Sequence, residues 1–109
     1  MRNKSREPAH DLDEAKRLAE SGDYFLARRA QSFVMDHYGT TGETVRAVFA
    51  AIEPRHFRKT VELKNRPGIL ADVYCGMVYD EIEWYVKFFM EDGVPMLDIW
   101  SMNWDGAVH

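Results

Sequence analysis

The chain has 109 residues and a mass of 12.7 kDa, which is the size of one domain. Its 46% hydrophobic and 29% charged residues are typical of a globular protein and argue against intrinsic disorder. The net charge of -4 argues against a protein that binds nucleic acid with its whole surface, while leaving room for a local basic site. No apolar run reaches the ~18 residues that span a bilayer, and the basic start lacks the apolar segment of a secretory signal. With Cys75 as its single cysteine, we expect a cytoplasmic protein without membrane contact.

The first half of the chain has the apolar spacing of amphipathic helices. One helix is predicted from Asp11 and stops at Gly22, with acidic residues near its start, where they complement the helix dipole. A second is predicted from Leu26 to Tyr38, followed by Gly39 as a left-handed C-cap. Residues 1–10 are polar, so we expect a flexible N-terminal segment and a single domain over residues 11–109.

A third helix is predicted after Gly39. Thr40 and Glu43 have the spacing of a capping box before an apolar stripe. Pro54 disfavours helical geometry at Glu53, so this helix is expected to end there. The N-terminal half therefore predicts three amphipathic helices.

After Pro54 the apolar period changes from 3.6 to 2, which predicts strands. Four strands are expected, over residues 57–63, 69–74, 82–90 and 96–102. Turn signals at residues 65–68 and 91–93 make the connections short, so consecutive strands should pair antiparallel. Helices followed by a sheet predict an α+β fold, with N-terminal helices packed on a small antiparallel sheet.

The strand over residues 82–90 has one apolar face and one mixed face. Trp84 and its apolar partners are expected to pack on the helices, while Tyr85 and Lys87 lie about 7 Å apart on the other face. If residues 97–99 contribute core side chains, Trp100 joins Tyr85 and Lys87 on that open face. An aromatic beside a basic residue is a common arrangement for stacking single-stranded bases and holding their phosphates. A solvated sheet face without a site is the alternative interpretation.

Lys59 lies in phase with Phe57 and Val61, where a charge is costly unless the end of the strand is open. A lysine that extends its charged end into solvent explains the same pattern. This alternation places Arg58 on the opposite face. The four histidines have no metal-ligand spacing, and one cysteine cannot build a cysteine-based zinc site, so no metal is expected.

Five short segments carry a family resemblance that covers nearly the whole chain: residues 8–12, 27–30, 57–61, 72–74 and 84–87. Phe57-Arg58-Lys59-Thr60-Val61 is similar to a phenylalanine-tyrosine-lysine-serine-methionine motif, and Asp72-Val73-Tyr74 matches an aspartate-valine-tyrosine motif. In this order the segments resemble the MqsR family of bacterial toxins, small RelE-like mRNA interferases that are paired with an antitoxin. The resemblance implies a RelE-like fold.

The resemblance also implies a site. Lys59 and Tyr85 match catalytic positions of the family. Two further positions differ, because Ala71 stands where the family has glutamine, and the segment 101–103 lacks the family's lysine. Candidate substrate-binding residues around the two catalytic ones are Arg58, Lys87, Trp100 and His56.

The activity implied by the resemblance is that of an endoribonuclease that uses the 2′-hydroxyl of RNA and needs no metal or small-molecule cofactor. Its partners would be mRNA and an antitoxin protein. Two other functions are open at this point. Loss of the glutamine and lysine favours a toxin-like module that binds RNA or a protein without cleavage. A protein-interaction domain that uses the aromatic sheet is the third, and its binding would be insensitive to salt.

Overall fold

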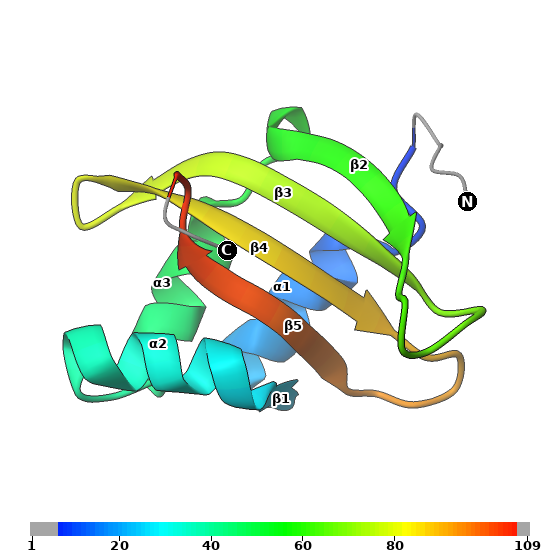
Figure 1. Cartoon of the computed structure of the whole chain (residues 1–109), viewed down its shortest axis with the longest axis horizontal. Helices are drawn as coiled ribbons and strands as arrows, with labels where there is room; N and C mark the ends of the chain where they lie inside the picture. Colours follow the sequence, from blue (N-terminus) through cyan, green and yellow to red (C-terminus); the bar gives the residue numbers. More distant parts are fainter. Residues whose placement is uncertain (1–6, 107–109) are drawn as a thin grey trace.

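The computed structural model describes residues 7–106, which form three helices and a five-stranded sheet (Figure 1). Residues 1–6 of the segment expected to be flexible, and residues 107–109 at the other end, lie outside the described part. The helices are α1 Leu12–Ser21, α2 Arg28–Tyr38 and α3 Gly42–Ala51, followed by the short 3₁₀ turn η1 Pro54–His56. The strands are β1 Tyr24–Leu26, β2 Phe57–Glu62, β3 Leu70–Tyr79, β4 Ile82–Met90 and β5 Leu97–Trp104. The predicted α+β fold is confirmed.

The strand order is β1-β5-β4-β3-β2, and β2 to β5 pair antiparallel, as predicted. The strand β1 was not predicted, and it pairs parallel with β5 at the edge of the sheet. The expectation that α2 begins at Leu26 is therefore wrong. Leu26 pairs with Ile99 instead, and the N–H of Ala27 donates to the Ile99 carbonyl at 3.0 Å. The aromatic and apolar residues of β1 suit a pleated strand, and sheet pairing overrides the helical spacing there.

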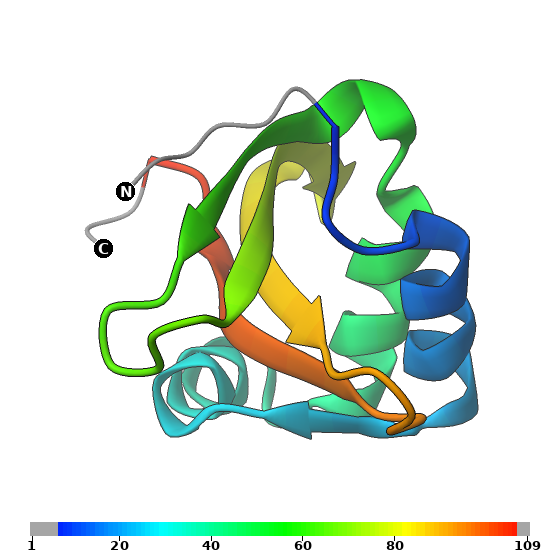
Figure 2. The same ribbon diagram turned by 90° about the vertical axis from the view of Figure 1, so that its right-hand side faces the viewer.

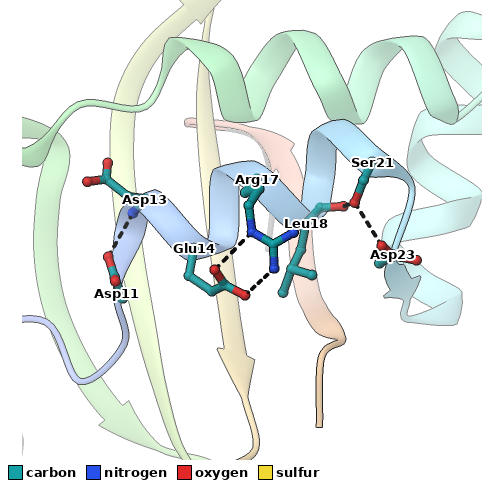
Figure 3. Close-up of polar contacts among 7 residues, drawn as sticks. All are labelled: Asp11, Asp13, Glu14, Arg17, Leu18, Ser21 and Asp23. Carbon is teal, nitrogen blue, oxygen red and sulfur yellow. Dashed lines mark hydrogen bonds and ion pairs between the residues drawn. The ribbon is translucent and has the colours of Figure 1, made fainter.

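The ends of α1 follow ordinary capping chemistry, and Figure 3 shows the cap that Asp11 forms at its start. The Asp11 carboxylate accepts from the Asp13 N–H at 3.0 Å, and Gly22 closes the helix in the left-handed region, with φ +87°. The capping box expected at Thr40 and Glu43 is wrong. The helix α3 begins one residue later, after Thr41, whose backbone is already helical and whose side chain makes no capping hydrogen bond.

The helices cover one face of the curved sheet, and Figure 2 shows α1 and α3 on the same side of it. At the centre of this core, the fully buried rings of Tyr74 and Phe88 stack at 5.7 Å. Trp84 is also fully buried, and its indole N–H donates to the Tyr79 carbonyl at 3.1 Å. Among residues 7–106, the opposite, open face carries a smaller apolar cluster, formed by Leu63, Ala71 and Phe89 with their neighbours. Much of the open face is therefore left for other side chains.

Asp72 on β3 ties the start of the chain to the sheet. Its carboxylate is fully buried and accepts from the backbone N–H groups of Ala9 at 2.9 Å and His10 at 2.8 Å. The Thr60 hydroxyl donates to the same carboxylate at 2.6 Å. The last two residues of the segment expected to be flexible are thus hydrogen-bonded to β3.

The turn between β3 and β4 holds two non-glycine residues in the left-handed region, Asp80 with φ +60° and Glu81 with φ +62°. We expect Glu81→Gly to raise the free energy of unfolding by about 0.5–1 kcal/mol, because glycine adopts this conformation without steric cost. Asp80 is kept because it accepts a hydrogen bond from the Tyr38 hydroxyl. Urea denaturation measures the effect. The control Glu83→Gly makes the same change inside β4 and should be destabilising, and equal effects in both variants would contradict the interpretation.

Candidate active site

A β-bulge in β2 decides which side chains face the open side of the sheet. Phe57 pairs with Tyr74 and Lys59 with Val73, so Arg58 is an extra residue between them. Phe57 packs its ring against Tyr74 on the helix side, while Lys59 points to the open face with Val73. The predicted alternation, with Phe57 and Lys59 together and Arg58 opposite, is therefore wrong. Arg58 and Lys59 are both exposed, and both act electrostatically on the Cys75 thiol of the open face.

The candidate residues form two neighbouring rows across the strands. The first row, in register from β2 to β5, is Lys59, Val73, Lys87 and Ser101. Because strands lie about 4.8 Å apart, the backbones of Lys59 and Lys87 are separated by about 10 Å. In the second row Tyr85 stands between Cys75 and Asn103. The fold thus brings together four predicted site residues from β2 and β4: Arg58, Lys59, Tyr85 and Lys87.

A second bulge places Trp100 at the same site. Lys87 pairs with Ser101 and Phe88 with Ile99, so Trp100 is the extra residue on β5. Ser101 therefore shares the open face with Trp100, whereas Met102 is buried in the helix-side core. Strict alternation from Trp100 would instead put Met102 on the open face and Ser101 in the core, and the bulge reverses both.

Two hollows meet at Lys87 and Trp100. One, of about 410 Å³, lies between α2 and the open face of β4 and β5. The other, of about 340 Å³, lies toward the connection between β2 and β3. Larger hollows, of about 560 and 570 Å³, lie around His10 and the β4–β5 connection, away from the basic residues. We place the candidate site at the smaller two, because the basic and phenolic groups converge there.

Burial shifts the acid–base behaviour of the two half-buried groups on β4. The pKa of the Tyr85 phenol is raised, mainly because burial disfavours the phenolate, although the Arg58 charge opposes this. The pKa of Lys87 is lowered, first by burial and then by repulsion from Lys59. Tyr85 is therefore a hydrogen-bond donor at neutral pH, and Lys87 gives up its proton more easily than an ordinary lysine.

His56 lies apart from this group. It ends η1, is 7% exposed, and its Nδ1 accepts from the Glu53 N–H at 2.9 Å. Burial and the nearby Arg55 lower its pKa, which favours the neutral ring. Its Cδ2 lies 3.8 Å from the point where a Cβ on Gly76 would stand. Gly76 is the extra residue of a bulge in β3, between Cys75 and Met77. The structure thus packs His56 against this bulge and not in the row that holds Lys59 and Lys87.

Sequence reasoning missed two residues of the site, Arg29 and Asn103. Both line the hollow between α2 and the sheet. In the sequence, Asn103 stands out only as the last residue of the segment that lacks the family's lysine, and Arg29 only as one residue of the second predicted helix. The available signal was the i, i+4 spacing of Arg29 and Phe33, which places both on one side of α2 and in the same hollow.

Within residues 7–106, no group of three or more histidine, cysteine, aspartate or glutamate residues is arranged to hold a metal ion. None of the helices in this range is both long and apolar enough to cross a membrane.

Comparison with known proteins identifies the family. The family model described as "Motility quorum-sensing regulator, toxin of MqsA" matches residues 7–102. No curated protein matches the chain. The family match begins before α1 and ends within β5, so it includes Lys59, Tyr85 and Lys87 of the open face. The chain therefore belongs to the MqsR family of toxins, in which a toxin is paired with an antitoxin.

Proposed function

We propose that this toxin is an mRNA interferase, an endoribonuclease that cleaves RNA through its 2′-hydroxyl and is neutralised by its antitoxin in the cytoplasm. The observation that supports this most is the bulge in β2. It turns Arg58 to the side of Lys59, so that two cations face the same side as Lys87 in a chain with a net charge of -4. Such a local concentration of positive charge has little value for folding, but it suits a phosphate backbone.

The reaction has three parts. The 2′-hydroxyl loses its proton to water as its oxygen attacks the neighbouring phosphorus, negative charge builds up on the phosphate oxygens, and the 5′-oxygen leaves with a proton supplied by the protein. Lys59 and Arg58 stabilise the negative charge that builds up on the phosphate oxygens, and the arginine is able to contact two of them. Because the RNA carries its own nucleophile, no metal-bound water is required.

The groups on β4 complete the site. Tyr85 stays protonated at neutral pH, so it donates a hydrogen bond to the phosphate or a proton to the leaving oxygen. Lys87 holds a flanking phosphate and, with its lowered pKa, is a second proton donor. Trp100 stacks a base beside them. We assign His56 a structural role in η1, because its Nδ1 is already occupied by the Glu53 N–H.

The experiment that tests this function is incubation of the purified protein with a long labelled RNA and a chelator. We expect discrete products that end in a 2′,3′-cyclic phosphate. A substrate with 2′-deoxyribose at the mapped cleavage position should resist cutting there. Cleavage of that substituted position, or loss of activity with the chelator, would exclude the proposed chemistry.

A second candidate is a toxin-like module that binds RNA without cutting it. Ala71, at the family's glutamine position, is fully buried beside Leu63 and Phe89 and brings no polar group. Asn103 ends the segment in which the family has lysine, and it brings no charge. If the folded protein retains RNA on a filter but releases no products, this second function replaces the first.

The lowered pKa of Lys87 predicts how RNA binding depends on pH. Folded Lys87 loses its proton below the ordinary value of 10.5. Between the lowered pKa and 10.5, Lys87 is protonated in the unfolded chain but not in the folded protein, so the free energy of unfolding rises with pH. Over the same range the folded protein loses the positive charge of Lys87, and its attraction for phosphate falls. Affinity for a non-cleavable 2′-O-methyl RNA should drop about fivefold, equivalent to about 1 kcal/mol, on approaching pH 10.5.

The matched variant for this titration is Lys87→Arg, which keeps its charge over the whole range. We expect the alkaline loss of affinity to begin at higher pH in the variant than in the wild type. Identical titrations of the two proteins would show that Lys87 does not contact the backbone of the RNA.

A further inference from the structure

The hollow between α2 and the sheet has aromatic side chains from two different elements. Phe33 from α2 and Trp100 from β5 both line it, and Arg29 stands one helical turn before Phe33. Tyr85 and Lys87 line the same space from β4. Figure 1 shows α2 running beside β5, which gives the hollow its second wall. An aromatic-lined space next to the proposed catalytic groups has the character of a nucleobase pocket.

Asn103 adds a specific polar feature to this pocket. Its side-chain Oδ1 is buried and has no hydrogen-bond partner among residues 7–106. It stands opposite Tyr85 on the neighbouring strand and lines the pocket. A buried carbonyl oxygen without a donor costs about 1–3 kcal/mol, so a ligand that supplies a donor is favoured at this point.

We propose that this pocket binds the base next to the cleaved phosphate and that Asn103 selects a base with an exocyclic amino group. The inference rests on the proposed RNA substrate and adds a specificity-determining residue to it. Trp100 and Phe33 stack on any base, because every base has an aromatic face. Selection therefore falls to the polar contact, where an amino N–H donates to Asn103 Oδ1.

The positive charges at the pocket suit a nucleotide whose base is bound between the aromatic side chains. Arg29 is exposed and lines the pocket from α2, while Lys87 lines it from the sheet. Two cations flanking an aromatic pocket hold the phosphates on either side of a bound nucleotide. A base that presents a carbonyl oxygen in place of the amino group faces Oδ1 with a second acceptor, which is repulsive.

Binding of short 2′-O-methyl oligonucleotides tests the proposal without any need for cleavage. Cytosine and uracil differ by an amino group in place of a carbonyl, and so do adenine and hypoxanthine. We expect oligo(C) to bind about tenfold more tightly than oligo(U), and oligo(A) more tightly than oligo(I). The difference corresponds to the cost of leaving the buried Asn103 Oδ1 without a hydrogen-bond donor. Fluorescence anisotropy of labelled oligonucleotides measures these ratios.

Two variants separate the selecting contact from packing. Asn103→Leu removes the acceptor at similar size, so both ratios should shrink severalfold toward one. Asn103→Asp keeps two acceptor oxygens and should preserve the preference for amino-bearing bases, even if its charge weakens binding overall. Wild-type ratios near one, or ratios unchanged in Asn103→Leu, would overturn the proposal.

The outcomes for specificity and for catalysis are distinguishable. Selective binding without cleavage of natural RNA would retain the pocket and reject the nuclease. Cleavage together with unselective binding would retain the nuclease and reject the role of Asn103. If no oligonucleotide binds, both are rejected.

Discussion

Lys59→Ala is expected to lower the rate of RNA cleavage by about 10²–10³-fold, the usual cost of removing one preorganised group that stabilises charge in the transition state. The loss should be large because Lys59 and Arg58 act as a pair at the bulge. The other cation of the row, Lys87, has its backbone about 10 Å away across two strands and does not replace Lys59 there. Stability should change little, since Lys59 is exposed.

Single-turnover cleavage of a labelled RNA, with thermal unfolding of each protein alongside, measures this effect. The control is Arg17→Ala, which removes one positive charge from an exposed ion pair on α1 and should leave cleavage unchanged. Tyr85→Phe removes only the hydroxyl and should cost about 10²-fold. Full activity in both Lys59→Ala and Tyr85→Phe would place the catalytic groups elsewhere.

The elements with a strong apolar period were predictable from the sequence. The helices α1 and α3 and the strands β2 to β5 appear near the residues that the period indicates, although β3 continues past its predicted end at residue 74 to Tyr79. The three residues of β1 gave no such signal. They are held by pairing with β5, a contact between residues more than 70 positions apart, which no local pattern encodes.

The site was predictable in composition but not in geometry. Tyr85 and Lys87 share a face because β4 continues with regular alternation past both of them. Arg58 and Trp100 are different, because each is the extra residue of a bulge. A bulge shifts every later side chain to the other face, and its position depends on the partner strand. Strict alternation therefore placed Lys59 with Phe57 and Met102 with Trp100, whereas the structure puts the members of each pair on opposite faces.

Asp72 is a residue whose importance the sequence motif indicated without giving its reason. It belongs to the aspartate-valine-tyrosine segment, yet its side chain lies on the helix side with Thr60, opposite the open face that carries Lys59 and Lys87. Its carboxylate instead receives donors from β2 and from the start of the chain. Its role is therefore architectural, and the expected effect of replacing it is on folding.

Asp72→Ala is expected to lower the free energy of unfolding by about 3–5 kcal/mol. The Thr60 hydroxyl and the N–H groups of Ala9 and His10 would lose a shared charged acceptor, and each hydrogen bond to a charged group contributes about 1.5–3 kcal/mol. Urea denaturation measures the loss. The control Asp36→Ala, at an exposed position of α2, should stay within about 0.5 kcal/mol of the wild type.

A double variant identifies the origin of this cost. Replacing Thr60 with valine in the Asp72→Ala background removes one of the stranded donors at nearly constant volume, so the double variant should be more stable than the two single effects added together. In the single variant Asp72→Ala, amide exchange at Ala9 and His10 should also become faster, because their acceptor is gone. If the two effects simply add and exchange at both amides is unchanged, the stability supplied by Asp72 does not come from these hydrogen bonds.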